Sequence, residues 1–231
     1  MSGPTPDSCC PPERPERPAR AESLGEIGQH FDKRYQEWEP IAPEATDLLF
    51  TWLREEGLAG STIMDIGCGT GELLVRALEA GATRGSGADL SSAAIAMASD
   101  LAHETGNEGR LDLWVGDAAV EPLDAHDVVV LDKVICCYPD AGALIARSTD
   151  AARHLYAFAV PESTGFWGLI ARARWFVFGL MELIQGSHIP RFVHDRREVQ
   201  AKVEAAGFRP LHTGRQFVWF VAVYGREPVT G

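Results

Sequence analysis

A chain of 231 residues, 45% of them hydrophobic, is long enough to bury one sizeable core, so a single globular domain is the first expectation. The net charge of −12, with lysine at only three positions, argues against a protein that grips nucleic acid through phosphate contacts and favours a small-molecule partner. The chain has five cysteines, an odd number, and no signal-peptide pattern precedes them. These two features favour the reducing cytoplasm over a secreted disulfide framework.

The first part of the chain is expected to form a tail and two helices. Six prolines within residues 1–20 leave little apolar surface to bury, which predicts a disordered tail over residues 1–21 and one domain over residues 22–231. Apolar residues then recur every three or four positions from 22 to 38. This spacing predicts a helix that either packs on the domain or forms an arm over a cleft. A second helix is expected to begin at Pro43 and to end near Gly57.

Residues 61–71 predict a nucleotide-binding turn. A short apolar strand precedes Gly67, Gly69 and Gly71, and a helix is expected to begin near Glu72. Glycine suits such a turn because a Cβ would obstruct a ligand lying against the backbone. A dinucleotide fingerprint would place its third glycine at position 72, where this chain has glutamate. Asp65, before the first glycine, supplies a carboxylate where an ammonium group could sit.

This D-x-G-x-G-x-G pattern resembles motif I of the class I S-adenosylmethionine (SAM) dependent methyltransferases, and the order of elements is similar over about residues 45–225. The resemblance implies an α/β, Rossmann-like fold. In that fold a seven-stranded, mostly parallel sheet carries helices on both faces, and the last strand runs antiparallel. The resemblance also implies SAM as the cofactor.

Two acids follow at the ends of the next expected strands. Asp89 ends the strand near 86–90, 22 residues after the first glycine, where a carboxylate meets ribose hydroxyls, and Leu90 lies beside it. Capping of the helix from 91 to 104 is the alternative role of Asp89. Beyond the strand at 111–115, the resemblance implies that Asp117 and the backbone of Ala118 hold the adenine base.

The clearest central strand is residues 127–132, four consecutive apolar residues between acids, as expected of a strand covered on both faces. Its last residue, Asp132, is expected to help Asp65 and Gly67 hold the methionine part of the cofactor. Further strands are expected at 153–160, 208–211 and 217–224, with a helix from 196 to 206 before the last two.

The segment from Leu131 to Pro139 resembles the corresponding segment of magnesium-protoporphyrin IX methyltransferases and their bacterial relatives. That family has a histidine before its Tyr-Pro pair and a tyrosine in the N-terminal arm. Tyr35 matches the arm tyrosine, whereas Cys137 replaces the histidine, which argues against a porphyrin substrate. Cys136 and Cys137 read as small buried side chains rather than ligands, because no C-x-x-C spacing accompanies them, and no metal site is predicted.

An apolar, aromatic run from 166 to 184 is interrupted by charged residues, so no uncharged span long enough to insert stably in a membrane is expected. The run is either buried on the sheet or in a homodimer interface, or it forms a helical cap, about 163–190, over the acceptor. The residues expected to contact the substrate are Tyr138, Trp167, Trp175 and Phe178.

The expected function is transfer of a methyl group from SAM to a small hydrophobic or aromatic acceptor, such as a secondary metabolite. Proton removal, where the acceptor needs it, is assigned to His194, Tyr35 or His30, although His194 has a structural alternative at the start of the helix from 196. Three alternatives remain open: a SAM-fold cyclase or isomerase without net methyl transfer, an NAD-dependent oxidoreductase, and a non-enzymatic partner protein.

Overall fold

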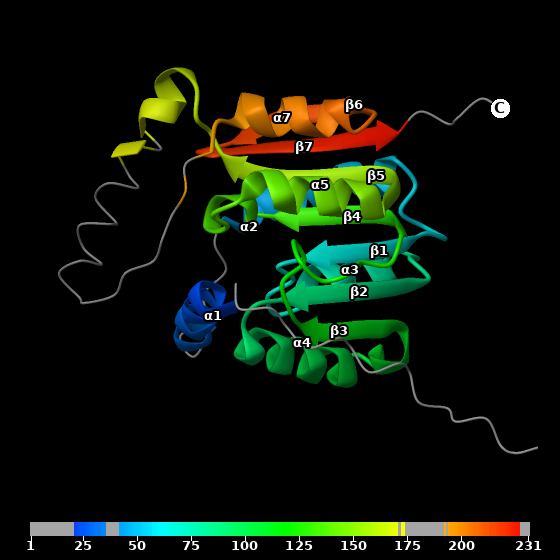
Figure 1. Cartoon of the computed structure of the whole chain (residues 1–231). Coiled ribbons are helices and arrows are strands. Elements are labelled where there is room, and N and C mark those ends of the chain that lie inside the picture. The colour runs from blue at the N-terminus through cyan, green and yellow to red at the C-terminus, as the bar shows by residue number, and fades with distance from the viewer. Residues whose placement is uncertain (1–20, 36–41, 171, 174–191, 193, 227–231) are drawn as a thin grey trace, which may run out of the picture.

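A computed structural model describes residues 21–35, 42–170, 172–173, 192 and 194–226 (Figure 1). Its helices and strands are α1 (Ala21–Tyr35), α2 (Pro43–Glu55), β1 (Thr62–Ile66), α3 (Glu72–Glu79), β2 (Arg84–Asp89), α4 (Ser92–Glu104), η1 (Glu108–Arg110), β3 (Leu111–Val115), β4 (His126–Asp132), η2 (Ile135–Cys137), α5 (Ala141–Ala151), β5 (Ala152–Pro161), α7 (Arg196–Ala205), β6 (Phe208–Gln216) and β7 (Trp219–Arg226). Residues 165–170 are also helical. The predicted tail and most of the predicted cap lie outside the described residues.

The seven strands form one sheet in the order β3-β2-β1-β4-β5-β7-β6. Neighbouring strands run parallel from β3 to β5, and β7 runs antiparallel to both β5 and β6. The predicted mostly parallel α/β sheet with an antiparallel last strand is therefore confirmed. The strand order reverses between β1 and β4, and ligands of open α/β sheets bind outside the carboxyl ends of the strands at such a point.

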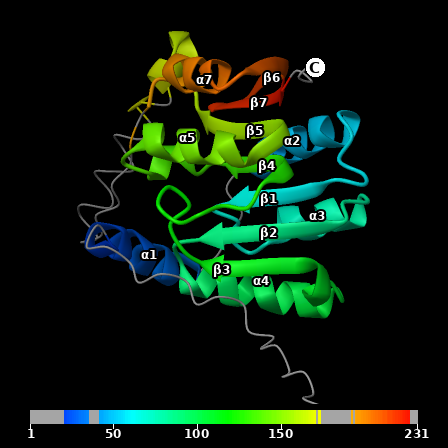
Figure 2. The same ribbon diagram turned by 45° about the vertical axis from the view of Figure 1, so that its right-hand side comes forward.

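Helices cover both faces of the sheet, as predicted. In β4, Val129 and Leu131 face one core cluster, which includes residues of α5 and α7, while Val128 and Val130 face a second cluster, which includes residues of α2 and α3. The two core clusters explain why this strand is apolar without alternation, because it is covered on both faces. Figure 2 shows α5 and α7 together over one face of the sheet.

Helix α1 lies apart from these layers, beyond the carboxyl ends of the parallel strands (Figure 1). It begins and ends near the predicted helix of residues 22–38, although residues 36–38 lie outside the described part of the chain. Gly28 brings it close to the turn after β2, since a Cβ at this glycine would lie 2.5 Å from the carbonyl oxygen of Leu90. The predicted arm is thus placed at the edge of the sheet where a ligand is expected.

Two elements differ from the sequence-based expectation. Helix α5 was not predicted; Asp140 caps it by accepting a hydrogen bond of 2.9 Å from the amide of Ala143. Strand β6 continues to Gln216, five residues beyond its predicted end. β6 is an edge strand with most side chains at least partly exposed, so it lacks the apolar alternation that marks a half-buried strand. Among the described residues, no helix is long and apolar enough to cross a membrane.

Candidate active site

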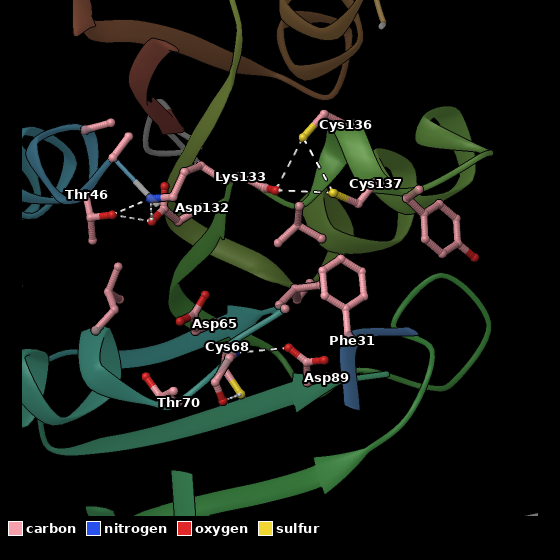
Figure 3. Close-up of a pocket in the computed structure, with 18 of the residues that line it drawn as sticks. Phe31, Thr46, Asp65, Cys68, Thr70, Asp89, Asp132, Lys133, Cys136 and Cys137 are labelled. Atoms are coloured by element: carbon pink, nitrogen blue, oxygen red, sulfur yellow. Dashed lines mark hydrogen bonds and ion pairs between the residues drawn. The ribbon is translucent and has the colours of Figure 1, made fainter. Parts of the chain in front are cut away.

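A cavity of about 960 Å³ lies at the carboxyl ends of β1, β2 and β4 (Figure 3). The predicted site residues that line it are Tyr35, Asp65, Gly67, Gly69, Asp89, Leu90, Asp117, Ala118, Asp132 and Tyr138. Because these residues come from six separate segments of the chain, the fold brings most of the predicted site to one place.

The glycine turn forms the floor of the cavity between β1 and α3. Its glycines have φ angles of +73° (Gly67), +53° (Gly69) and +75° (Gly71), which residues with a Cβ seldom adopt. The amides of Gly67 and Cys68 both donate to the carbonyl oxygen of Ala88 in β2, at 2.7 and 3.1 Å. A Cβ at Gly67 would lie 2.3 Å from a methyl carbon of Val134. The turn therefore needs glycine both for its torsions and for the close approach of the segment after β4.

Asp89 joins the glycine turn to helix α4. Its Oδ2 accepts a hydrogen bond of 3.0 Å from the amide of Gly69, and its Oδ1 accepts one of 2.9 Å from the amide of Ser91. The capping alternative is partly right, because Asp89 contacts the start of the helix, although the side chain of Ser91 accepts the capping bond from Ala94. A carboxylate has about four acceptor positions, and since the amide of Leu90 also bonds to Asp89, about one position remains for a ligand hydroxyl. Burial raises the pKa of Asp89, against these hydrogen bonds.

The buried Asp65 and the partly buried Asp132 form an acidic pair near the ends of β1 and β4. Oδ1 of each carboxylate is buried and has no hydrogen-bond partner among the described residues. Asp132 uses its other oxygen, which accepts bonds from Thr46 Oγ1 at 2.6 Å and from Lys133 Nζ at 2.5 Å. Burial raises the pKa of Asp65 well above its ordinary value, and repulsion by Asp132 and Asp89 raises it further, while Lys133 lowers it.

Asp117 and Tyr138 contact each other in the structure, although the sequence assigned them to the adenine base and the substrate. The Tyr138 hydroxyl lies 3.0 Å from both carboxylate oxygens of Asp117 and donates to them. The amide of Ala119 also donates to Asp117, at 3.0 Å. Tyr138 is buried, so its ring forms part of the cavity wall and its hydroxyl orients the acid.

The arm helix α1 lines the cavity with Ile27, Phe31 and Tyr35. A Cβ at Gly69 would lie 2.7 Å from the Tyr35 hydroxyl oxygen, so the tyrosine reaches the glycine turn. The helix is held there by Asp32, whose carboxylate accepts hydrogen bonds from Ser91 Oγ at 2.6 Å and from the amide of Ala93 at 2.9 Å.

Four predicted site residues are not among the described residues that line the cavity. Gly71 packs on α4 instead, since a Cβ there would lie 2.9 Å from Cβ of Ala98. His194 binds the carbonyl oxygen of Tyr138 through Nε2 at 2.9 Å and stacks on Phe192. The other two are His30 and Trp167.

His30 and Trp167 also lie outside that lining. His30 makes an edge contact with Phe31. Trp167 lies under the guanidinium group of Arg215, at 4.2 Å from the ring centroid. Trp175 and Phe178 lie outside the described residues. Of the three candidate proton acceptors, Tyr35 is the one that the described structure places in the cavity lining.

Several residues of the cavity were not predicted from the sequence. Thr46 and Lys133 complete the hydrogen-bond cluster of Asp132, and the lysine side chain is only 16% exposed. Three aromatic side chains also line the cavity: Phe192, which precedes α7, and Phe217 and Trp219, which lie where β6 turns into β7. The sequence signal for Lys133 is its place directly after β4; Thr46 carries no comparable signal.

The strand order and the site geometry define a class I methyltransferase domain. Residues 63–155 match the family described as "Methyltransferase domain", so the chain contains a domain of this SAM-dependent enzyme class. A ribosomal protein L11 methyltransferase of Edwardsiella ictaluri is 38% identical to the chain over 112 residues, which are 45% of this chain and 38% of that protein. The chain thus spans well under half the length of the curated relatives that it matches.

Two solved structures share the fold over most of the chain. The magnesium protoporphyrin IX methyltransferase of Synechocystis PCC 6803 with bound S-adenosylhomocysteine (SAH) has a TM-score of 0.70 at 18% identity, covering 87% of this chain and 98% of that one. The [4+2]-cyclase SpnF has a TM-score of 0.62 at 14% identity, covering 89% and 94%. At these identities the likeness is one of fold, and it agrees with the methyltransferase resemblance seen in the sequence.

The residues of the cavity fit SAM. The partnerless Oδ1 atoms of Asp65 and Asp132 are suited to a group that carries N–H donors and positive charge, as the methionine end of SAM does. Asp89 keeps an acceptor position for a ligand hydroxyl. The glycine turn leaves backbone accessible in the cavity floor. SAM is therefore the cofactor that this domain takes.

Proposed function

We propose that this protein transfers the methyl group of SAM to a small hydrophobic or aromatic acceptor, of the kind found among secondary metabolites. The proposal rests on one observation: carboxylates and aromatic side chains line two walls of the same cavity. One wall bears the carboxylates of Asp65, Asp89 and Asp132, and the other is built from aromatic side chains of α1, of Phe192, which precedes α7 in the chain, and of the β6–β7 turn.

The chain's contribution to the reaction is mainly orientation. Bound SAM supplies an already activated methyl group, so no covalent nucleophile of the protein is needed. Holding two reactants in line contributes about 7 to 11 kcal/mol to lowering the barrier. The aromatic rings of Phe31, Phe192 and Trp219 are suited to hold a flat or apolar acceptor and to exclude water. Tyr35 is the side chain best placed to accept a proton from a hydroxyl acceptor, whereas a carboxylate acceptor needs none.

The cyclase or isomerase without net methyl transfer stays as the alternative within this fold, supported by the structural likeness to SpnF. The NAD-dependent alternative loses support, because the matching family is a methyltransferase domain and Glu72 occupies the place of the third dinucleotide glycine. A protein acceptor is the second candidate, because the curated relatives are named for ribosomal protein L11.

The first experiment is mass spectrometry of small molecules that copurify with the chain, followed by calorimetry with SAM, SAH and NAD. We expect SAH or SAM to copurify and to bind at micromolar concentration. Binding of NAD in the absence of SAM and SAH binding would refute the proposed cofactor and with it the reaction.

A second experiment separates the acceptor classes. The chain is incubated with SAM carrying a tritiated methyl group, and with either a panel of aromatic and apolar metabolites or ribosomal protein L11. Label in the small-molecule extract supports the proposal. Label only in the protein fraction would replace it with the protein-acceptor candidate, and product without label would replace it with the cyclase or isomerase.

A further inference from the structure

Lys133 follows β4 directly and has a backbone conformation that is unusual for a residue with a side chain. Its φ angle of +62° lies in the left-handed region, although its amide still donates to the carbonyl oxygen of Ala159 in β5 at 3.1 Å. Residues in this region of φ cluster at ligand sites, where the surrounding structure fixes them. Here the result is a cationic side chain in the cavity wall, of which 16% is exposed.

The ammonium group of Lys133 keeps one hydrogen-bond donor for a ligand. It has three N–H donors, of which one bonds to Oγ1 of Thr46 and one to Oδ2 of Asp132. Thr46 in turn donates to the same Oδ2 at 2.6 Å, so its hydroxyl fixes the lysine beside the acid. The third donor has no partner among the described residues, and it belongs to a side chain that lines the cavity.

Asp132 brings an acceptor and a cation side by side. Its Oδ1 is buried and has no partner in the described part of the chain, while its Oδ2 bonds to the ammonium group of Lys133. Asp65 adds a second partnerless oxygen, and Figure 3 shows it on the same side of the cavity as Thr46, Lys133 and Asp132. A ligand whose ammonium and carboxylate groups share one carbon needs such neighbours, because its N–H groups require acceptors and its oxygens require a cation.

The other cationic side chain of the described lining is engaged elsewhere. Arg76 of α3 pairs with Asp47 at 2.8 Å and lies over the ring of Phe50, at 4.4 Å from its centroid. The first turn of α2, which contains Thr46, also lines the cavity, and no side chain is seen to cap it among the described residues. The partial positive charge at this helix end adds to that of Lys133 in favouring an anion.

We propose that Lys133 binds the carboxylate at the methionine end of SAM, and that Thr46 is the positioning residue for its ammonium group. The site then recognises a zwitterion, because Asp65 and Asp132 take the ammonium group of the ligand and Lys133 takes its carboxylate. This role accounts for a cation among the acids of a cavity that takes a positively charged methyl donor. The inference needs SAM as the cofactor, but it does not depend on which acceptor receives the methyl group.

The test compares three ligands by calorimetry: SAH, the carboxamide of SAH, in which a neutral amide replaces the carboxylate, and methylthioadenosine, which lacks the amino-acid end. Lys133→Met should weaken SAH binding about 10- to 150-fold, as expected for the loss of one hydrogen bond between charged groups. The affinity for the carboxamide and for methylthioadenosine should fall by less than about threefold, which also shows that the variant is folded. The matched control is Arg76→Met, which removes the other cation of the described lining and should leave SAH binding within about threefold.

Three further comparisons use the same ligands. Lys133→Arg keeps the cation and should recover most of the SAH affinity that Lys133→Met loses. Thr46→Val should lower the ratio of SAH affinity to carboxamide affinity and leave methylthioadenosine binding unchanged, which a merely structural role of the threonine would not do. The unsubstituted protein should bind SAH several-fold more tightly than the carboxamide. Equal affinities of the unsubstituted protein for these two ligands, or equal losses for all three ligands in Lys133→Met, would overturn the proposal.

Discussion

Single carboxylates set the chemistry of this cavity, because Asp65 is buried near two further, partly buried carboxylates with little compensating charge. Asp65 is 3% exposed, and its nearest charged neighbours include Asp89 and Asp132, with Lys133 as an opposing charge. A buried carboxylate without a partner favours its neutral form. A ligand with a cationic end offsets the free-energy cost of the buried negative charge. The carboxylates that destabilise the protein without a ligand therefore favour binding of a cationic ligand.

The raised pKa of Asp65 predicts a specific pH dependence of stability. The carboxyl is neutral in both folded and unfolded chains below its ordinary pKa of 3.8, and the folded chain binds more protons than the unfolded one between that value and the raised pKa. Stability is therefore lost as the pH rises through this window. Asp65→Asn should remove the loss, so its free energy of unfolding should exceed that of the wild type above the window and approach it at low pH.

Chemical denaturation of the wild type and Asp65→Asn across this pH range checks the sign. The measured quantity is the difference in unfolding free energy between the two proteins, because other groups also make stability depend on pH. Asp127 contributes the opposite dependence: burial alone would raise its pKa, but hydrogen bonds from Thr62 lower it. A variant that is less stable than the wild type at neutral pH would contradict the assignment. Asp127→Asn serves as the contrasting variant, since it should lose stability at neutral pH.

Asp89 is expected to matter far more for SAM binding than His194. Hydrogen bonds to a charged group contribute about 1.5 to 3 kcal/mol each, so Asp89→Asn should weaken SAM binding about 10- to 150-fold in calorimetry. His194→Ala should change it less than about threefold, because His194 contacts Tyr138 and Phe192 rather than the cavity. Equal losses in the two variants would undo this division of roles, and circular dichroism confirms that both remain folded.

The sequence led to acids and to two glycines that the structure places in the cavity lining, because their spacing is local. Asp65 stands two residues before Gly67, and Asp89 ends the next strand, so counting along the chain was sufficient. Thr46 escaped because its partner Asp132 lies 86 residues away and only the folded sheet brings them together. The positive φ of +62° at Lys133 likewise follows from the turn after β4 and leaves no pattern in the sequence.

At the scale of elements, the arm helix α1 depends on a few polar contacts for its position. Its Asp32 accepts hydrogen bonds from the first residues of α4, as a capping residue does. Partial burial alone would raise the pKa of this carboxyl, but the bonds from Ala93, Ser91 and Ser92 lower it. The carboxylate also lies near the positive end of the α4 dipole, which favours its charged form.

Asp32→Ala should therefore loosen α1 with little effect on the rest of the fold. Loss of a capping interaction costs about 0.5 to 2 kcal/mol, and we expect amide hydrogens of residues 21–35 to exchange several-fold faster by mass spectrometry while the β4 and β5 amides keep their protection. Lys33→Ala, at an exposed neighbouring position of the same helix, is the matched control. Unchanged exchange in Asp32→Ala would show that apolar packing alone holds the arm.

Helices and strands could be predicted from the sequence where one face or both faces of the element are buried, and less well elsewhere. The apolar β4 was placed within one residue of its observed start, since His126 precedes the predicted Asp127. Helix α5 was missed; its sequence mixes Gly142, Ser148 and Thr149 with apolar residues, and the two hydroxyls bond to carbonyl groups of the preceding turn. Such residues are weak helix formers, so packing against the sheet rather than propensity decides that this segment is helical.

At the scale of the molecule, the sheet order follows from the alternation of strands and helices, which favours right-handed crossovers between parallel strands. The order places the ends of β1, β2 and β4 side by side and so assembles the site from residues far apart in sequence. The sequence therefore predicts the fold in more detail than it predicts the acceptor. The aromatic walls of the cavity come from α1, from Phe192 before α7 and from the β6–β7 turn, and no local sequence motif records that these segments meet in space.

Binding of the cofactor should stabilise the whole chain, because the cavity joins the strands to the arm helix. A ligand present at 100 times its dissociation constant adds about 2.7 kcal/mol to the free energy of unfolding. For a chain of 231 residues each kcal/mol raises Tm by about 2 to 4 °C, so SAM or SAH should raise it by about 5 to 11 °C in a thermal scan. NAD at the same concentration should leave Tm unchanged. In Asp89→Asn the shift at the same SAM concentration should shrink to about half or less, because the affinity is expected to fall about 10- to 150-fold. A full shift with NAD, or none with SAM and SAH, would remove the basis for assigning the donor.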